Sequence, residues 1–315
     1  MHYVGRADWS MTQTAPASTA VANGLSRLVL VGAAQGAVHT ELAIGALAPG
    51  GWIQRHVHSY EEALYVLEGA LLLELNGAHH ALESGDYALI PIGAWHMLGN
   101  GSPDPVRWLA VSTPQRLPPD AGRRDTVYLP GQASVDELSA YARRPAFGDP
   151  TVQLVGHYDG TPPQAEALHL ADPARGRAPA GMDTALLAYS GISVKMLVDR
   201  GFGADHLTMF TVDYEPGGAA QAHDHPFEET YFFLAGEIEA ELDGTHHVLR
   251  AGDVVFAGVG SVHGFYNTGT DRVRWIETQA PQPPARHAYR WVESWKRFEA
   301  AVAGSPSGKE GVATD

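Results

Sequence analysis

Cysteine is absent from the 315-residue chain. Disulfide bonds and thiolate metal ligands are therefore excluded, so any bound metal must be held by His, Asp or Glu, and the chain has 16 His. Long apolar runs are also missing: no stretch of about 20 apolar residues occurs, and the N-terminal segment lacks the apolar core of a signal peptide. We expect a soluble, cytoplasmic protein that does not bind membranes.

Positive charge is scarce as well. The chain has 21 Lys and Arg against 36 Asp and Glu, for a formal net charge of −15, and no stripe rich in Lys or Arg. Such a chain would repel a phosphate backbone, which argues against nucleic acid as a partner. The expected partner is a small-molecule substrate, with homo-oligomer formation left open. The 35 Gly and 21 Pro favour a turn-rich β fold over a helical bundle.

An internal repeat spans most of the chain. The segment PGGWIQRHVHSYEEALYVLEG starts at Pro49, and the similar segment PGGAAQAHDHPFEETYFFLAG starts at Pro216, 167 positions later. The same offset relates further matching pairs without a gap: Ser26 and Ser193, His39 and His206, Gly85 and Gly252, Asn100 and Asn267. Duplication of one domain is the simplest interpretation, and a chain of this length can hold two domains.

Each copy reads as short antiparallel strands. Asn76-Gly77 and Asp243-Gly244 each separate two β-rich runs, which is the pattern of a tight hairpin. One short helix is predicted over 134–144, where Ser134 and Glu137 form a capping box. The expected divisions of the chain are a first domain (1–120), a linker and packing segment (121–190), a second domain (191–285), a C-terminal helix (286–303) with Trp291, Trp295 and Phe298 on one face, and a disordered tail (304–315).

Both copies carry the same pattern of three histidines and one glutamate. Two histidines lie two positions apart, so on a strand both imidazoles point to the same face. The glutamate follows past a turn and can join from the neighbouring strand, and the third histidine comes after a Gly-rich turn. The two sets of candidate metal ligands are His56, His58, Glu62 and His96 in the first copy, and His223, His225, Glu229 and His263 in the second.

Three neutral nitrogens and one carboxylate suit a divalent transition metal. We expect two such ions per chain, with Fe, Mn or Ni preferred and Zn or Co as alternatives. A lone histidine is more often a structural residue than a ligand. Two complete sets with identical internal spacing are hard to explain as solvated surface, so the repetition favours metal binding.

These residues closely resemble the two motifs of the cupin superfamily. The first motif, G(x)5HxH(x)3E(x)6G, is met at 50–69 and again at 217–236. The second, G(x)5PxG(x)2H(x)3N, is met at 85–100, and at 252–267 with Gly258 in place of the proline. The resemblance implies an all-β fold of two tandem double-stranded β-helix (jelly-roll) barrels with a metal inside each. It implies little about the reaction, because this fold hosts dioxygenases, decarboxylases, isomerases, hydrolases and storage proteins.

The walls of the two expected pockets differ. Residues two positions from a ligand on one strand share its face, which selects Gln54, Leu64, Val66 and Leu98 around the first site. Around the second site it selects Gln221, Tyr231, Phe233 and Phe265, with Glu277 where the first copy has Ala110. We predict that the second barrel is the main catalytic site, with Tyr231 and Glu277 as catalytic groups and Gln221, Phe233, Phe265 and Gln54 as substrate-binding residues. The alternative is that Tyr231 and Phe233 only fill the barrel.

Three hypotheses for the function follow from the resemblance. The leading one is a metal-dependent oxidoreductase similar to the bicupin dioxygenases, acting on a small organic substrate. The second is a manganese-dependent hydrolase resembling (S)-ureidoglycine aminohydrolase, although that family has a different His/Glu/Gln ligand set in its second domain. The third is a non-catalytic ligand-binding or storage bicupin, although storage members usually lose the metal ligands that this chain keeps.

Overall fold

The strands of the two copies form two separate sheets in the computed structural model, which describes residues 1–8, 13–14, 20–118, 121–131, 134–147, 153–161, 189–284 and 289–291. The first sheet contains β2 (Gln13–Thr14), β3 (Ala22–Val31), β4 (Glu41–His58), β5 (Glu61–Glu68), β6 (Ala70–Leu75), β7 (Ala78–Glu83), β8 (Asp86–Ile90), β9 (His96–Gly99), β10 (Val106–Thr113), β11 (Thr126–Tyr128) and β12 (Val155–His157).

The second sheet repeats this arrangement. It contains β1 (His2–Arg6), β13 (Tyr189–Val198), β14 (Thr208–Asp224), β15 (Glu228–Ala235), β16 (Glu237–Leu242), β17 (Thr245–Arg250), β18 (Asp253–Ala257), β19 (His263–Tyr266), β20 (Val273–Ala280) and β21 (Arg290–Trp291). The strand orders correspond: β12-β8-β5-β10-β4-β9-β6-β7 in the first sheet and β1-β18-β15-β20-β14-β19-β16-β17 in the second. The all-β prediction of two tandem jelly-roll barrels is confirmed.

One long strand closes each barrel. The first half of β4 pairs with β10 and its second half pairs with β9, and β14 pairs with β20 and β19 in the same way. Gly50 and Gly217 lie between these halves with φ of 71° and 80°. A glycine adopts this left-handed conformation without strain, so the strand can turn from one half of the barrel to the other. His56 and His58 are among the last residues of β4, whereas in the second copy His223 lies at the end of β14 and His225 directly follows it.

Both predicted hairpins are present. Asn76 and Gly77 have φ of 48° and 88° between β6 and β7, and Asp243 and Gly244 have 47° and 78° between β16 and β17. Positive φ at both central residues is the signature of a type I′ turn, whose twist matches that of the flanking strands. The turn with the proline replacement also keeps its geometry, because Gly260 N–H donates to the His225 carbonyl as Gly93 N–H donates to that of His58, both at 3.0 Å.

Helices play a small part in the described residues. The predicted helix is α1 (Val135–Tyr141), and the Glu137 N–H donates to the Ser134 hydroxyl at 3.1 Å. A short 3-10 helix, η2, covers Ala33–Gln35. The expected C-terminal helix (286–303) and the tail (304–315) lie outside the described residues, except that Arg290–Trp291 form strand β21 beside β14 rather than helix. Backbone pairing with the end of β14 explains this difference.

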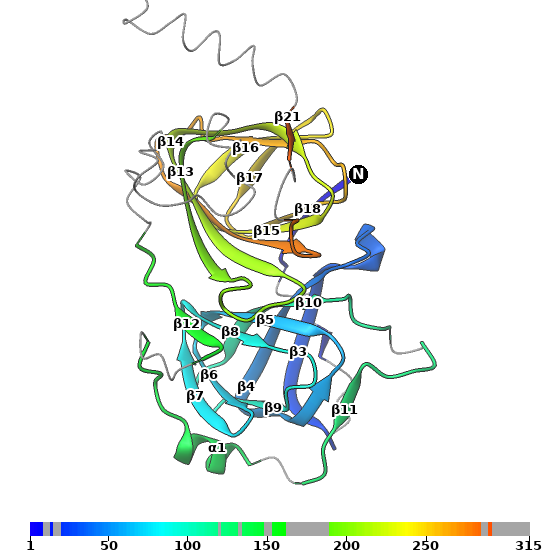
Figure 1. Cartoon of the computed structure of the whole chain (residues 1–315). Coiled ribbons are helices and arrows are strands. Elements are labelled where there is room, and N and C mark those ends of the chain that lie inside the picture. The colour runs from blue at the N-terminus through cyan, green and yellow to red at the C-terminus, as the bar shows by residue number, and fades with distance from the viewer. Residues whose placement is uncertain are drawn as a thin grey trace, which may run out of the picture.

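The two barrels exchange their outer strands. Strand β1, at the start of the chain, pairs with β18 of the second barrel, whereas β12 pairs with β8 of the first. Figure 1 shows the consequence, with the N-terminus beside the second barrel and β12 lying against the first. Each exchanged strand occupies the same place in its barrel, since β8 and β18 match across the repeat.

The barrels also share one hydrophobic core. This core, called here the interface core, joins side chains from both sheets: Leu42, Ile44, Leu109 and Val111 from the first, and Leu207, Met209, Phe232 and Ile276 from the second, among others. At the edge of the interface core, two equivalent carboxylates, Glu61 and Glu228, each accept hydrogen bonds from the backbone of the other barrel. The backbone N–H groups of residues 205–207 donate to Glu61 at 2.8 to 3.1 Å, and those of residues 38–40 donate to Glu228 at 2.7 to 3.1 Å. The contacts are related by the same offset as the sequence repeat, so the two barrels pack as a pseudo-twofold pair.

Candidate metal centres

The first candidate centre lies inside the first barrel. His56 and His58 come from the end of β4, Glu62 from β5 and His96 from the start of β9, and all four are buried. The ring centroids of His56 and His58 lie 4.0 and 4.8 Å from that of His96. The Nε2 atom of His58 lies 3.5 Å from a Glu62 oxygen. Ligand atoms of His58, Glu62 and His96 lie within 4.8 Å of one another, and the ring of His56 lies beside that of His96.

The second candidate centre has a similar arrangement. His223 lies at the end of β14 and His225 directly follows that strand, Glu229 lies on β15 and His263 begins β19, and these side chains are also buried. Ligand atoms of the three histidines lie within 4.8 Å of one another. The Nε2 atoms of His225 and His263 lie 2.7 and 3.1 Å from the same Glu229 oxygen.

The histidines are oriented as metal ligands would be. The Nδ1 atoms of His56, His96, His223, His225 and His263 lie 2.7 to 3.1 Å from backbone carbonyl oxygens. A carbonyl can only accept a hydrogen bond, so each Nδ1 carries the proton and each Nε2 keeps its lone pair. The Nε2 atoms of His58, His96, His225 and His263 are buried and form no hydrogen bond of normal geometry, although those of His58, His225 and His263 face a glutamate oxygen at 2.7 to 3.5 Å. Buried nitrogens left unsatisfied in this way fit a bound cation.

Burial favours the neutral form, which is the form that binds metal, at three of the candidate histidines. It lowers the pKa of His56 to about 4 and holds the pKa values of His96 and His223 well below the ordinary range. For Glu62, burial raises the pKa, but the adjacent His58 and the charge of Arg116 outweigh it and lower the pKa to about 2.

The second centre holds two carboxyl groups with opposite pKa shifts. Burial raises the pKa of Glu229, but the adjacent imidazoles of His225 and His263 outweigh it and bring that pKa well below the usual range. Burial and then the negative charge of Glu229 raise the pKa of Glu277 well above it. The Trp275 indole N–H donates to Glu277 at 2.9 Å.

The predicted catalytic residues lie beside Glu229. The hydroxyl of Tyr231 donates to Glu229 Oε2, and the Gln279 amide donates to the other oxygen, Oε1, at 2.8 Å. Glu277 pairs with Tyr231 across β15 and β20. Both predicted residues therefore surround the carboxylate of the second centre, and Gln279 is a third polar neighbour that the strand-parity argument did not select.

The predicted aromatic walls lie deeper. The rings of Phe233 and Phe265 each lie 5.2 Å from that of Trp275, and Phe265 lies 6.1 Å from His263. Both are almost fully buried in the core of the second barrel. In the first barrel the corresponding wall is aliphatic, with Leu64, Val66 and Leu98 buried among other apolar side chains.

Gln54 and Gln221 support the ligands through their backbones. Their carbonyl oxygens accept the Nδ1 protons of His56 and His223. The side-chain amide of Gln54 is used elsewhere, because it donates to the carbonyls of Leu129, at 3.1 Å, and Gly131. This contact ties the segment after β11 to the first barrel.

Several aromatic neighbours were not found by sequence reasoning. Tyr60 stacks on His58 and Phe227 stacks on His225, both with ring centroids 3.9 Å apart. Tyr128 and Tyr289 lie 5.5 and 5.6 Å from the first histidine of each set, His56 and His223. In the sequence analysis, Tyr60 and Phe227 would have counted only as turn residues. Both are aromatic and occupy the same position in the two repeats, and this was the signal that could have identified them as neighbours of the histidines.

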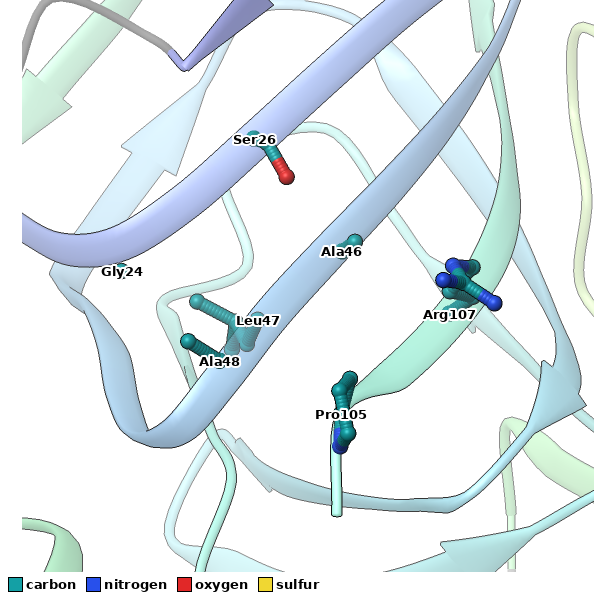
Figure 2. A pocket seen from close by; sticks show the side chains of 7 residues that line it. All are labelled: Gly24, Ser26, Ala46, Leu47, Ala48, Pro105 and Arg107. Atoms are coloured by element: carbon teal, nitrogen blue, oxygen red, sulfur yellow. The ribbon is translucent and has the colours of Figure 1, made fainter. Parts of the chain in front are cut away.

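One surface pocket lies apart from both centres. Figure 2 shows this pocket of about 230 Å³ between β3, β4 and the start of β10, with Arg107 at one side. Its lining residues are Gly24, Ser26, Ala46, Leu47, Ala48, Pro105 and Arg107. None of them is a candidate ligand, so this pocket does not belong to the metal centres.

Comparison with known proteins agrees with this architecture. A cupin domain family model matches residues 43–112 and 210–278. TcmJ, a tetracenomycin polyketide synthase protein of Streptomyces glaucescens, is 30% identical over 112 residues, which cover 35% of this chain and 75% of the relative. The chain is a bicupin of the cupin superfamily.

Two solved structures resemble the bicupin along most of its length. A glyoxylate-induced protein from Pseudomonas aeruginosa is 19% identical, with a TM-score of 0.59, covering 93% of this chain and 92% of that one. Salicylate 1,2-dioxygenase from Pseudaminobacter salicylatoxidans is 14% identical, with a TM-score of 0.62, covering 89% and 84%. At these identities the likeness concerns the fold. Within the part of the bicupin that the structure describes, no helix has the length and apolarity needed to cross a membrane.

Tyr231→Phe is expected to weaken metal binding at the second centre by roughly 10- to 100-fold. The Tyr231 hydroxyl holds Glu229 in place, and loss of a group that hydrogen-bonds to a metal ligand typically lowers metal affinity by that factor. Competition with a chelator of known affinity measures the change. Tyr158→Phe is a matched control, since it removes a buried hydroxyl that donates to Asp213, away from the candidate ligands. Equal affinities for the Tyr231 variant and the unaltered chain would contradict the expectation.

Proposed function

We propose that this bicupin is a metal-dependent oxidoreductase of the dioxygenase type, acting on a small organic substrate. The observation that supports it best is the set of buried, converging imidazole nitrogens with unsatisfied Nε2 atoms at each centre. When bound, a divalent Fe, Mn or Ni ion supplies a Lewis-acidic and redox-capable centre with open positions for a substrate and O2. Two such ions per chain are proposed.

The residues of the second barrel support catalysis there. Tyr231 and Gln279 hold both oxygens of Glu229, so this carboxylate keeps one orientation. Trp275 orients Glu277 beside it, and the buried rings of Phe233 and Phe265 exclude water from the barrel. In the first barrel the positions of Tyr231, Glu277 and Gln279 are held by Leu64, Ala110 and Ser112, which offer far fewer polar contacts.

The manganese hydrolase remains the second candidate. The standard three-histidine set in the second barrel speaks against it, because that family carries a different ligand set in this domain. A non-catalytic bicupin is the third candidate, and the two intact ligand sets speak against it. The three candidates differ in what they consume, so one measurement separates them.

Oxygen uptake is expected to be proportional to substrate turnover. Protein purified in its native metal supply would be screened in an oxygen electrode against small aromatic and 2-oxo acids, with product analysis in parallel. Protein stripped by a chelator is the control and should consume no O2 above background. Product formation without O2 uptake would favour the hydrolase, and ligand binding without any product would favour the non-catalytic bicupin; either result refutes the dioxygenase proposal.

A further inference from the structure

An arginine beside the first metal centre has no ion-pair partner among the described residues. Arg116 follows β10 and is half-buried, and its guanidinium carbon lies 5.4 Å from the centroid of the Tyr60 ring. Tyr60 in turn stacks on His58. Among the residues that the structure describes, Arg116 forms this cation–π contact and no hydrogen bond or ion pair.

The carboxylates around Arg116 are already engaged. Glu41 pairs with Arg27 at 2.6 Å. The two oxygens of Asp125 accept the Leu117 N–H at 2.7 Å and the Thr126 hydroxyl at 3.0 Å. Glu62 faces His58 within the candidate centre. A guanidinium has five N–H donors in a planar fork, and withdrawing it from water without partners for them is costly.

In the part of the second barrel that the structure describes, the position equivalent to this arginine holds a proline. The two copies still make equivalent contacts at the residue before Arg116. Gln115 donates to the carbonyls of residues 37 and 40, and its equivalent Gln282 donates to those of residues 204 and 207. The next position is Arg116 in the first copy and Pro283 in the second. The second centre instead has the carboxyl groups of Glu229 and Glu277, so the electrostatics of the two centres differ.

We propose that the first barrel binds a small organic carboxylate beside its metal centre, with the carboxylate paired to the guanidinium of Arg116. An arginine fork fits the two oxygens of a carboxylate better than any other side chain does. Tyr60 and Tyr128 form aromatic walls next to the candidate ligands, and Tyr128 is 41% exposed, so the site is open at this side. The second barrel, with two carboxyl groups and no such cation, does not favour the same anion.

This inference goes beyond the proposed dioxygenase activity, because an ion pair needs neither O2 nor turnover. The residues around the first centre also differ from the almost purely aliphatic pocket that the sequence predicted. The aliphatic residues lie on the strands, whereas Arg116 and Tyr60 come from segments outside them.

Calorimetric titration of the metal-loaded full chain tests the site. Acetate and benzoate are compared with acetamide and benzamide, which have the same shape and no charge. We expect at least one carboxylate to bind about tenfold or more tightly than its amide, and Arg116→Gln to remove this preference. Arg123→Gln, at an exposed arginine of the following segment, should leave it unchanged. Equal binding of carboxylates and amides, or an undiminished preference in Arg116→Gln, overturns the proposal.

Two further variants locate the ligand. His225→Ala disturbs only the second centre. If the His225→Ala variant loses carboxylate binding while the Arg116→Gln variant keeps it, the ligand binds in the second barrel and the proposal is refuted. Arg116→Lys keeps the charge but loses the fork, and it should bind with intermediate affinity; it decides the matter if Arg116→Gln does not fold. Carboxylate binding without O2 uptake would refute the dioxygenase proposal alone, and O2 uptake without a carboxylate preference would refute this one alone.

Discussion

His225→Ala abolishes turnover, down to the background of the metal-free protein, if the second barrel is the main catalytic site. His225 supplies one of three converging imidazoles, and its Nε2 lies 2.7 Å from Glu229. Removing one ligand from such a set strips or misplaces the ion, and it also releases the carboxylate that Tyr231 and Gln279 hold. Steady-state rates, together with elemental analysis of the purified variant, measure the effect.

The matched variant at the first centre is His58→Ala, which removes the equivalent histidine. We expect it to lower thermal stability more than the rate, because few polar side chains surround the first centre on the strands. Elemental analysis should give about two metals per chain for the unaltered protein and about one for each variant. Loss of activity in His58→Ala with the second metal retained, and normal activity in His225→Ala, would reverse the assignment.

Separating the two barrels is expected to unfold or aggregate the first. A fragment of residues 1–120 exposes its half of the interface core and loses strand β12 from the edge of its sheet. Each buried aliphatic side chain stabilises a fold by about 1.5 to 3 kcal/mol, so exposing four of them costs about 6 to 12 kcal/mol, comparable to the whole stability of a domain. Size-exclusion chromatography and thermal melting test the expectation.

A point substitution gives a finer measure of the same interface. Glu228→Ala in the full chain leaves the N–H groups of residues 38–40 without their acceptor and should lower the free energy of unfolding by on the order of 3 kcal/mol. Glu237→Ala is its control, because the pair of Glu237 with Arg250 is exposed and contributes little. A fragment 1–120 that stays monomeric and as stable as the full chain would show that the intimate packing is wrong.

Structural features that depend on residues close together in the sequence were predicted successfully. The paired histidines converge because residues two apart on a strand share a face, and this rule needs no knowledge of the rest of the fold. The turns at Asn76-Gly77 and Asp243-Gly244 follow from the conformations that these residue types tolerate. The gapless repeat then carried each local conclusion from the first copy to the second.

At Arg290–Trp291 this reasoning fails, whereas residues 292–303 of the expected helix lie outside the described part of the chain. The aromatic spacing after residue 286 favoured a helix, yet Arg290–Trp291 pair with the end of β14. Propensity describes an isolated segment, whereas an open strand edge beside His223 and Asp224 offers backbone hydrogen bonds that override it. Similarly, strand parity selected Gln54 for the first pocket, but its amide is bound to backbone carbonyls of the segment after β11.

By itself, the sequence determined the two-barrel fold. It also predicted the two sets of candidate ligands and the contrast between aliphatic and polar strand faces, because spacing on strands and a constant offset encode them. Only the tertiary structure decided which distant segments meet. It showed the exchange of β1 and β12, the hydrogen bonds that Glu61 and Glu228 accept from the other barrel, and the position of Arg116 beside Tyr60. These contacts join residues that no local period relates. They depend on how the two barrels pack and on where the connecting chain can reach, and both are properties of the folded molecule.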